Sequence, residues 1–151
     1  MNLTFREAHW QDAEALIEIY NASFYADYVK YGQCPAYGRS KDEMEVSILR
    51  FPKELAICDG EIVGAISGQL VDFGVYEIGC LCVAPKFQGR GIGEQLFFHF
   101  LALHDDWKKI TLITPADNEH TISFYEQKCG MHLCGDEMDG EIKVVRLSKE
   151  Q

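Results

Sequence analysis

A glycine-rich loop between an apolar run and an amphipathic run is the feature that most constrains this chain. The apolar, β-branched stretch Ile78–Val83 leads into Pro85, and the loop Gln88–Gly93 follows. The next run, Glu94–Leu103, repeats its apolar residues at helical spacing. A strand, a glycine turn and a helix N-terminus in succession direct main-chain N–H groups at one concavity, where they can bind an anion. The segment therefore predicts a phosphate-binding loop inside an α/β fold.

The spacing of the loop glycines excludes two common phosphate-binding motifs. A P-loop requires lysine and then serine or threonine after its last glycine, but Gly93 is followed by Glu94. A dinucleotide-binding fingerprint needs its third small residue where this chain has Glu94 or Leu96. The pattern that remains is Gln88-x-x-Gly91-x-Gly93, and a purely structural turn is the alternative.

Size and composition indicate one globular domain. The chain has 151 residues, 47% of them hydrophobic and 25% charged, so we expect a single domain over residues 1–151. No apolar run approaches the ~20 residues of a membrane span, and the first residues lack the pattern of a secretory signal. We therefore expect a cytoplasmic protein that binds no membrane. The net charge of −10 argues against nucleic-acid binding. It favours a cationic partner such as an amine, unless the acidic residues only maintain solubility.

The cysteines suggest neither a disulfide framework nor a metal site. There are six of them: Cys34, Cys58, Cys80, Cys82, Cys129 and Cys134. None forms a Cys-x-x-Cys pair or has a histidine at the spacing of a zinc site. We expect most of them to be buried as small apolar residues and no metal to be bound. A redox or metal protein is the alternative class that they leave open.

The predicted elements follow the order β-α-α-β-β-β-α-β-α-β-β. The expected strands cover residues 3–8, 55–58, 62–71, 75–83, 110–114, 131–135 and 142–147, and the expected helices cover 12–22, 40–49, 94–103 and 118–129. Ser40-x-x-Glu43 forms a capping box at the start of the second helix. Residues 23–39 are expected to be irregular, and 136–141 to form an acidic turn. The helix–strand–helix passage after the glycine loop implies two neighbouring parallel strands in a mixed sheet.

The loop and this order of elements resemble the GNAT superfamily of acetyl-CoA-dependent N-acetyltransferases, over essentially the whole chain. A second segment, Asn118–Met131, is similar to the family pattern Asn-x-x-Ala-x-x-Phe-Tyr-x-x-x-Gly-Phe through Asn118, Tyr125 and Gly130. Thr121 replaces the alanine, and one extra residue separates Tyr125 from Gly130. The resemblance implies an α/β GNAT fold, in which two parallel strands splay apart and hold acetyl-CoA between them.

The same resemblance implies which residues bind the coenzyme. Main-chain groups of the loop would hold the pyrophosphate, Arg90 would reach a phosphate, and the end of the fourth strand would pair with pantetheine. The implied set is Leu81, Cys82, Val83, Gln88, Gly89, Arg90, Gly91, Ile92, Gly93 and Asn118. The alternative for Arg90 is that its side chain is only solvated. The alternative for the strand residues is that they only pack in the core, and the alternative for Asn118 is that it caps its helix.

Two residues are candidates for proton transfer. Glu77 lies in an otherwise apolar strand, at an offset from the loop similar to that of the general base in histone acetyltransferases of the superfamily. It could accept a proton from an ammonium, and a salt-bridged glutamate is the alternative. Tyr125 would protonate the departing CoA thiolate, and a core aromatic residue is the alternative.

The acceptor is the part of the function that the sequence specifies least. Tyr25, Tyr28, Tyr31, Tyr37 and Arg39 belong to the segment that lines the acceptor site in the family, where aromatic rings could hold a cation. We expect direct acetyl transfer to a small cationic amine or to the lysine side chain of a peptide. A GNAT-fold module that binds acyl-CoA without transferring the acyl group is the alternative, and a homodimer is left open.

Overall fold

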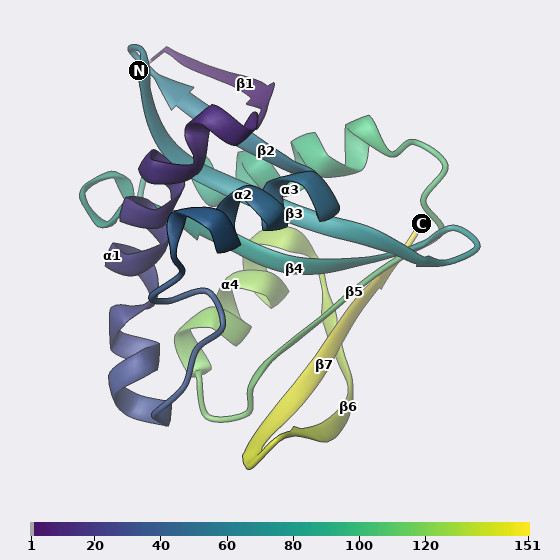
Figure 1. Cartoon of the computed structure of the whole chain (residues 1–151). Helices are drawn as coiled ribbons and strands as arrows, with labels where there is room; N and C mark the ends of the chain where they lie inside the picture. The colour runs from purple at the N-terminus through teal and green to yellow at the C-terminus, as the bar shows by residue number, and fades with distance from the viewer. Residues whose placement is uncertain (1) are drawn as a thin grey trace.

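The computed structural model describes residues 2–151 and contains the predicted order of elements (Figure 1). The strands are β1 (Leu3–Glu7), β2 (Lys53–Cys58), β3 (Glu61–Asp72), β4 (Val75–Val83), β5 (Lys109–Pro115), β6 (His132–Asp139) and β7 (Ile142–Glu150). The helices are α1 (Ala13–Tyr31), α2 (Lys41–Arg50), α3 (Ile92–Leu103) and α4 (Glu119–Cys129). Short 3-10 turns at Trp10–Asp12 and Pro85–Phe87 precede α1 and α3. The predicted mixed α/β fold class is confirmed.

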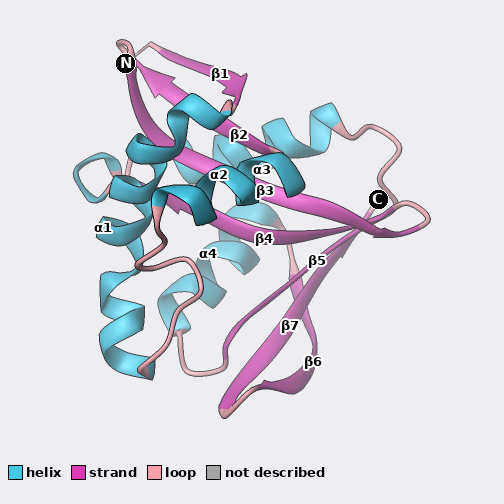
Figure 2. Cartoon of the chain, viewed as in Figure 1, coloured by secondary structure: helices cyan, strands magenta, loops and turns pink. Residues whose placement is uncertain are grey.

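The strands form one sheet in the order β1-β2-β3-β4-β5-β7-β6 (Figure 2). Strands β4 and β5 are parallel, and the other neighbours are antiparallel. The chain passes from β4 to β5 through α3, the crossover that a parallel pair requires. The parallel pair expected from the helix–strand–helix passage is therefore present.

Each face of the sheet carries its own apolar core. Helices α1 and α2 cover one face, where Leu16, Tyr20, Met44, Leu55, Ala65 and Cys82 are buried. Helices α3 and α4 cover the other face (Figure 1), where Ile78, Leu96, Phe97, Phe100, Ile110 and Tyr125 are buried. The sheet is therefore packed on both faces.

The parallel pair separates after a short contact. Val75–Glu77 pairs with Lys109–Thr111, and the pairing stops there although β4 continues to Val83 and β5 to Pro115. Figure 1 shows the two strands diverging from their common end. The separation leaves the β5-facing edge of β4 open beyond Glu77.

A β-bulge lies in β4 where the separation begins. Ser67 of β3 pairs with Cys80 and Gly68 pairs with Ile78, so Gly79 has no partner across the pair. An extra residue reverses the alternation of side chains. Accordingly Ile78 packs on the α3 face, whereas Cys80 packs on the α1 face. In a regular strand Glu77, Leu81 and Val83 would lie on the same face of the sheet. Because of the bulge, Glu77 lies on the opposite face from Leu81 and Val83.

Two predicted boundaries were wrong. Helix α1 runs to Tyr31 instead of ending near residue 22, so only the later part of 23–39 is irregular. No residue between 23 and 31 breaks a helix, and the stop comes at Gly32, whose φ of 74° suits the left-handed C-cap. Strand β6 likewise continues to Asp139 through most of the expected acidic turn, pairing with β7.

The helices were also compared with the length and hydropathy of a membrane-spanning helix. Among residues 2–151, no helix combines the length and the apolar character needed to cross a bilayer.

Candidate active site

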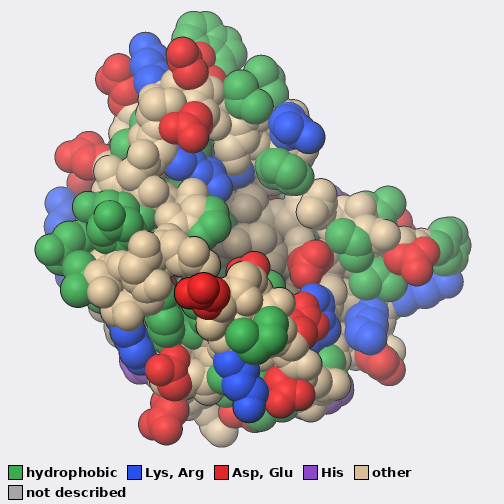
Figure 3. All heavy atoms as spheres, turned by 60° about the horizontal axis from the view of Figure 1, so that its bottom comes forward, with side chains coloured by type: hydrophobic (Ala, Val, Ile, Leu, Met, Phe, Trp, Pro, Cys, Tyr) green, Lys and Arg blue, Asp and Glu red, His purple; other side chains and the backbone are tan. Residues whose placement is uncertain are grey.

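A cavity of about 570 Å³ opens where β4 and β5 separate. Its walls come from β4, β5 and the start of α4 on one side, and from α1, the segment after it and the start of β2 on the other. Figure 3 shows the corresponding hollow, with Lys and Arg side chains at one edge and Asp and Glu side chains at the opposite edge. The cavity adjoins the open edge of β4.

The glycine loop ends at the N-terminus of α3. Gly89 and Gly91 have φ values of 78° and 80°, a region that favours glycine, and Gly91 is the N-cap of the helix. A Cβ on Gly91 would have no neighbour closer than 4.0 Å, so the space above it is open. A Cβ on Gly93 would lie 3.2 Å from the Phe124 ring, so the glycine at this position allows α3 and α4 to pack closely. The loop thus has the exposed main chain and the helix N-terminus that an anion site needs.

The side chains of the loop have other contacts as well. Gln88 donates through Nε2 to the Val83 carbonyl at 3.0 Å, which ties the loop to the end of β4. Arg90 is exposed and its guanidinium lies 5.2 Å from the Phe87 ring centroid. No carboxylate of residues 2–151 lies within 4.0 Å of it. Arg90 is therefore free to meet a phosphate.

Two of the predicted coenzyme residues are buried and could contribute only main-chain groups. The side chains of Cys82 and Ile92 are 5% and 1% exposed and lie in the two cores. Leu81 and Val83 are partly buried, and Leu81 lines the cavity. A role for Cys82 and Ile92 through their main chain is consistent with their places on the open strand edge and at the helix N-terminus.

Tyr125 and Asn118 both line the cavity on its α4 side. Tyr125 is 7% exposed, and burial raises the pKa of its phenol far above the ordinary value of 10.0. Asn118 caps α4, since its side chain accepts from the Thr121 N–H at 3.4 Å. Helix α4 ends at Gly130, whose φ of 72° lies in the left-handed region.

Glu77 also lines the cavity, but it is ion-paired. Its Oε1 accepts from Nη1 of Arg146 on β7 at 3.1 Å. The same nitrogen donates to Thr111 Oγ1 at 2.9 Å, and Nη2 of Arg146 binds Glu137 at 2.7 Å. Hydrogen bonds to Glu137 first and then to Glu77 raise the pKa of Arg146 above its ordinary value. Sequence reasoning missed Arg146 because nothing in the order of residues shows that β7 lies beside β5.

The far end of the cavity is basic, and most of its residues were not predicted. It contains Tyr20, Arg39, Ser47, Lys53 and Ser67. Lys53 is only 2% exposed, and burial lowers the pKa of its ammonium to about 8. Of these residues only Arg39 was expected at the acceptor site.

The predicted wall of tyrosines is wrong for three of its four members. Only Tyr31 lines the cavity, and its hydroxyl donates to Asp117 at 2.6 Å. Tyr25, Tyr28 and Tyr37 pack on one another instead, with the rings of Tyr28 and Tyr37 stacked at 4.6 Å. Tyr20 and Phe24 of α1 line the cavity as well, and the part of α1 beyond the predicted end carries Phe24 and Tyr31.

Cysteines and carboxylates complete the lining. Cys34 and Cys80 face the cavity, and all six cysteines are free thiols. Asp27 and Asp139 lie at the wall together with Glu77, and burial raises the pKa of Asp27. Among residues 2–151 no three His, Cys, Asp or Glu side chains are grouped as metal ligands.

Comparison with known protein families assigns the chain to one of them. The model of the acetyltransferase (GNAT) family matches residues 13–131, so the chain belongs to this family of acetyltransferases. The match includes the glycine loop, both proton-transfer candidates and α4. The comparison with curated proteins gives no match.

Solved structures share the fold at low sequence identity. The chain is similar to the PaiA N-acetyltransferase of Thermoplasma acidophilum in complex with coenzyme A, with 19% identity, full coverage of both chains and a TM-score of 0.79. An acetyltransferase of Thermus thermophilus aligns at 16% identity over 100% of this chain and 98% of its own, with a TM-score of 0.82. YncA of Salmonella typhimurium with its cofactor acetyl-CoA aligns at 16% identity over 98% of this chain and 93% of its own, with a TM-score of 0.75.

Proposed function

We propose that this protein is an N-acetyltransferase that moves the acetyl group of acetyl-CoA directly to a primary amine. The observation that carries the proposal is the separation of β4 from β5, with a glycine loop at one end and a cavity beside the open strand edge. The coenzyme-bound structures of PaiA and YncA, which have the same fold, support acetyl-CoA as the donor.

The coenzyme is proposed to bind through the main chain. N–H groups from Gln88 to Gly93 would hold the pyrophosphate, and the dipole of α3 would add roughly 0.5–1 kcal/mol per charge. Arg90 would meet another phosphate. Pantetheine would pair with the open edge of β4 from Val83 toward Leu81, much as an added strand does, and Asn118 would face it from α4. The thioester then arrives at the bulge, beside Tyr125.

Two proton transfers complete the reaction. Glu77 is proposed to take a proton from the acceptor ammonium, after which the neutral amine attacks the thioester carbonyl carbon. The tetrahedral intermediate expels the thiolate as the C–S bond breaks, and Tyr125 gives the thiolate its proton. The second proton that the nitrogen loses as the amide forms returns to the Tyr125 phenolate and restores the phenol. Burial keeps the Tyr125 phenol protonated, which is the state a donor needs. The ion pair with Arg146 holds the Glu77 carboxylate in place at the cavity wall.

The acceptor is proposed to carry a cationic amine, either on a small molecule or on a lysine side chain. Asp27, Glu77 and Asp139 line the cavity and favour an ammonium. The net charge of −10 acts in the same direction at longer range.

One observation favours the second candidate, an acyl-CoA-binding module without transferase activity. Arg146 holds Glu77 in an ion pair, so one oxygen of the proposed base is already occupied by a hydrogen bond within the chain. The two candidates differ in whether acetyl leaves the coenzyme. The test incubates the protein with radiolabelled acetyl-CoA and a panel of primary amines and follows label in the amine and released CoA thiol. Label transfer supports the enzyme, and coenzyme binding without transfer to any amine supports the binding module.

A further inference from the structure

The basic end of the cavity contains two cations without a carboxylate partner. Neither Arg39 nor Lys53 has an acidic oxygen within 4.0 Å among residues 2–151. Arg39 donates through Nε to the Pro35 carbonyl and through Nη1 to Ser47 Oγ, both at 3.0 Å. These contacts orient the guanidinium and leave its Nη2 donors unused within the described chain. The ammonium of Lys53 has one acceptor, the Phe51 carbonyl at 3.2 Å.

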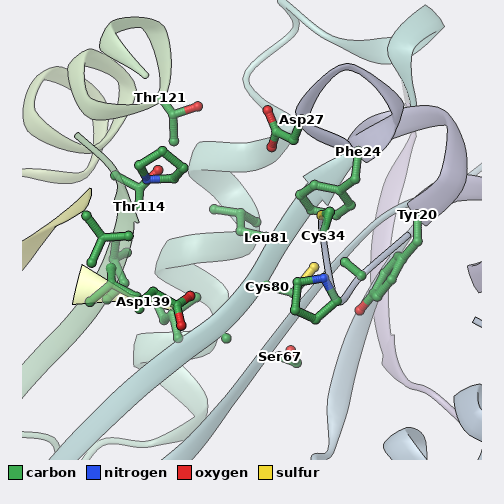
Figure 4. A pocket seen from close by; sticks show the side chains of 18 of the residues that line it. Tyr20, Phe24, Asp27, Cys34, Ser67, Cys80, Leu81, Thr114, Thr121 and Asp139 are labelled. Carbon is green, nitrogen blue, oxygen red and sulfur yellow. The ribbon is translucent and has the colours of Figure 1, made fainter. Parts of the chain in front are cut away.

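A buried hydroxyl without a partner lies beside these cations. Tyr20 is 1% exposed, and its hydroxyl has no nitrogen or oxygen partner among residues 2–151, with the weakly hydrogen-bonding Cys80 thiol as its polar neighbour. The Arg39 guanidinium lies 5.6 Å from the centroid of the Tyr20 ring. A buried hydroxyl without a hydrogen-bond partner is unfavourable, so we expect a ligand atom to bind at this position. In Figure 4 Tyr20 stands on the side of the cavity where Cys80 and Ser67 lie, across from Thr121 and Asp139.

The strand register connects this end of the cavity to the bulge in β4. Lys53 pairs with Ser67, and Ser67 pairs with Cys80, so the three residues form a row across β2, β3 and β4. Ser67 Oγ would lie 3.7 Å from a Cβ placed on Gly79, the bulge residue. Neighbouring strands are about 4.8 Å apart, so the row spans about 10 Å. A small molecule can therefore bridge the bulge and the buried cations.

We propose that Arg39, Lys53 and the Tyr20 hydroxyl bind a carboxylate of the acceptor, so that the acceptor is an amino acid. Its amine lies at the bulge between Glu77 and Tyr125, and its carboxylate lies at the basic end. Cationic and anionic linings at opposite ends match such a dipolar molecule better than they match a polycation. The inference rests on the proposed acetyltransferase function and names its acceptor class. The proposed acceptor has the cationic amine that the net charge of the protein favours, and it also has a carboxylate at its other end.

The test compares acceptors that differ only in the carboxyl group. L-amino acids and short ω-amino acids are assayed with acetyl-CoA by thiol release, each beside its carboxamide and beside the amine without the carboxyl group. Hydrogen bonds to charged groups contribute about 1.5–3 kcal/mol, so at least one amino acid should exceed its carboxamide by roughly tenfold or more in kcat/KM.

Variants assign the preference to the proposed residues. Arg39→Gln and Lys53→Met should each lower kcat/KM for the preferred amino acid about 10- to 100-fold, mainly through KM, and change the carboxamide little. Tyr20→Phe, which keeps the ring, should lower it by a smaller factor. Arg50→Gln and Lys41→Met are matched controls on the exposed surface of α2 and should leave the preference unchanged. Unaltered acetyl-CoA affinity and circular dichroism show that a variant is folded.

Each outcome bears on one of the two proposals. Transfer that is fastest to polyamines and is unaffected by Arg39→Gln and Lys53→Met would overturn the amino-acid assignment and leave the acetyltransferase in place. If no amine is acetylated, the acetyltransferase proposal fails. The subsite is then measured directly, by NMR titration of the same amino acids into the CoA-bound protein. Saturable binding that Lys53→Met abolishes supports the carboxylate site, and binding to none of them overturns it.

Discussion

Lys53 places an ammonium in a buried position where its contacts within the chain are few. Burial lowers its pKa from 10.5 to about 8, so protonation is disfavoured in the folded state relative to the unfolded state. The destabilisation is therefore fully present below about pH 8 and is relieved as the pH rises toward 10.5. At about 1.36 kcal/mol per pKa unit it amounts to at most about 3 kcal/mol.

We accordingly expect Lys53→Met to stabilise the fold at pH 7, by on the order of 1–3 kcal/mol, while it impairs acceptor binding. Urea denaturation at pH 7 and pH 10 measures the effect, and the gain should shrink at the higher pH. Lys41→Met, at an exposed site, should change the unfolding free energy by less than about 0.5 kcal/mol. A Lys53→Met protein that is less stable than the wild type at pH 7 would show that the ammonium has a structural partner.

Glu77 and Glu137 bind the same guanidinium, which gives a matched pair for the mechanism. Glu77→Gln should lower kcat by roughly 10²-fold, the usual scale of general base catalysis, and remove the acidic limb of the pH–rate profile. Glu137→Gln weakens the same cluster without removing the proposed base and should leave that limb in place. Equal losses in both variants would mean that the cluster acts structurally, and a base elsewhere, such as Asp27 or Asp139, would then be required.

At the scale of elements, the sequence predicts what local chemistry determines. The capping box at Ser40 is present as predicted, with both reciprocal hydrogen bonds, and the glycine loop ends at α3 as its spacing requires. The sequence did not predict the full length of α1, because aromatic residues such as those after residue 22 occur both in helices and in loops. The bulge at Gly79 and the row from Lys53 to Cys80 were missed because they depend on which strands pair. The pairing of β2, β3 and β4 brings Lys53 to the basic end of the cavity.

The glycine loop and the N-terminus of α3 allow a direct test of acetyl-CoA binding. Gly91→Glu should abolish acetyl-CoA binding, because a carboxylate would enter the open space above the N-cap and repel the pyrophosphate. The φ of 80° would also strain any non-glycine residue. Gly91→Asn controls for that strain, since asparagine tolerates the left-handed region, and it should bind acetyl-CoA with only moderately reduced affinity. Calorimetry on both folded variants makes the comparison. Undiminished affinity in Gly91→Glu would remove the loop from the coenzyme site.

At the scale of the whole molecule, the sheet is least complete where the function is proposed to lie. Strands β1 to β4 form one continuous ladder and β5, β7 and β6 form another, and the two are joined by Val75–Glu77 against Lys109–Thr111. A coenzyme that pairs with the open edge of β4 would bridge the two ladders. Binding should therefore stabilise the whole fold as well as fill a cleft.

We expect saturating acetyl-CoA to raise the free energy of unfolding by about 2.7 kcal/mol at a hundredfold excess over Kd. For a chain of this size that corresponds to a rise in Tm of roughly 5–10 °C. Hydrogen exchange should slow at amides from Gly79 to Val83 and from Gln88 to Gly93, and should change little in β1 and β2, which lie far along the sheet. Gly91→Glu is the control and should show neither effect. Protection confined to the glycine loop, with none along β4, would mean that the phosphates bind while the pantetheine lies elsewhere, and the reaction site would then have to move away from the bulge.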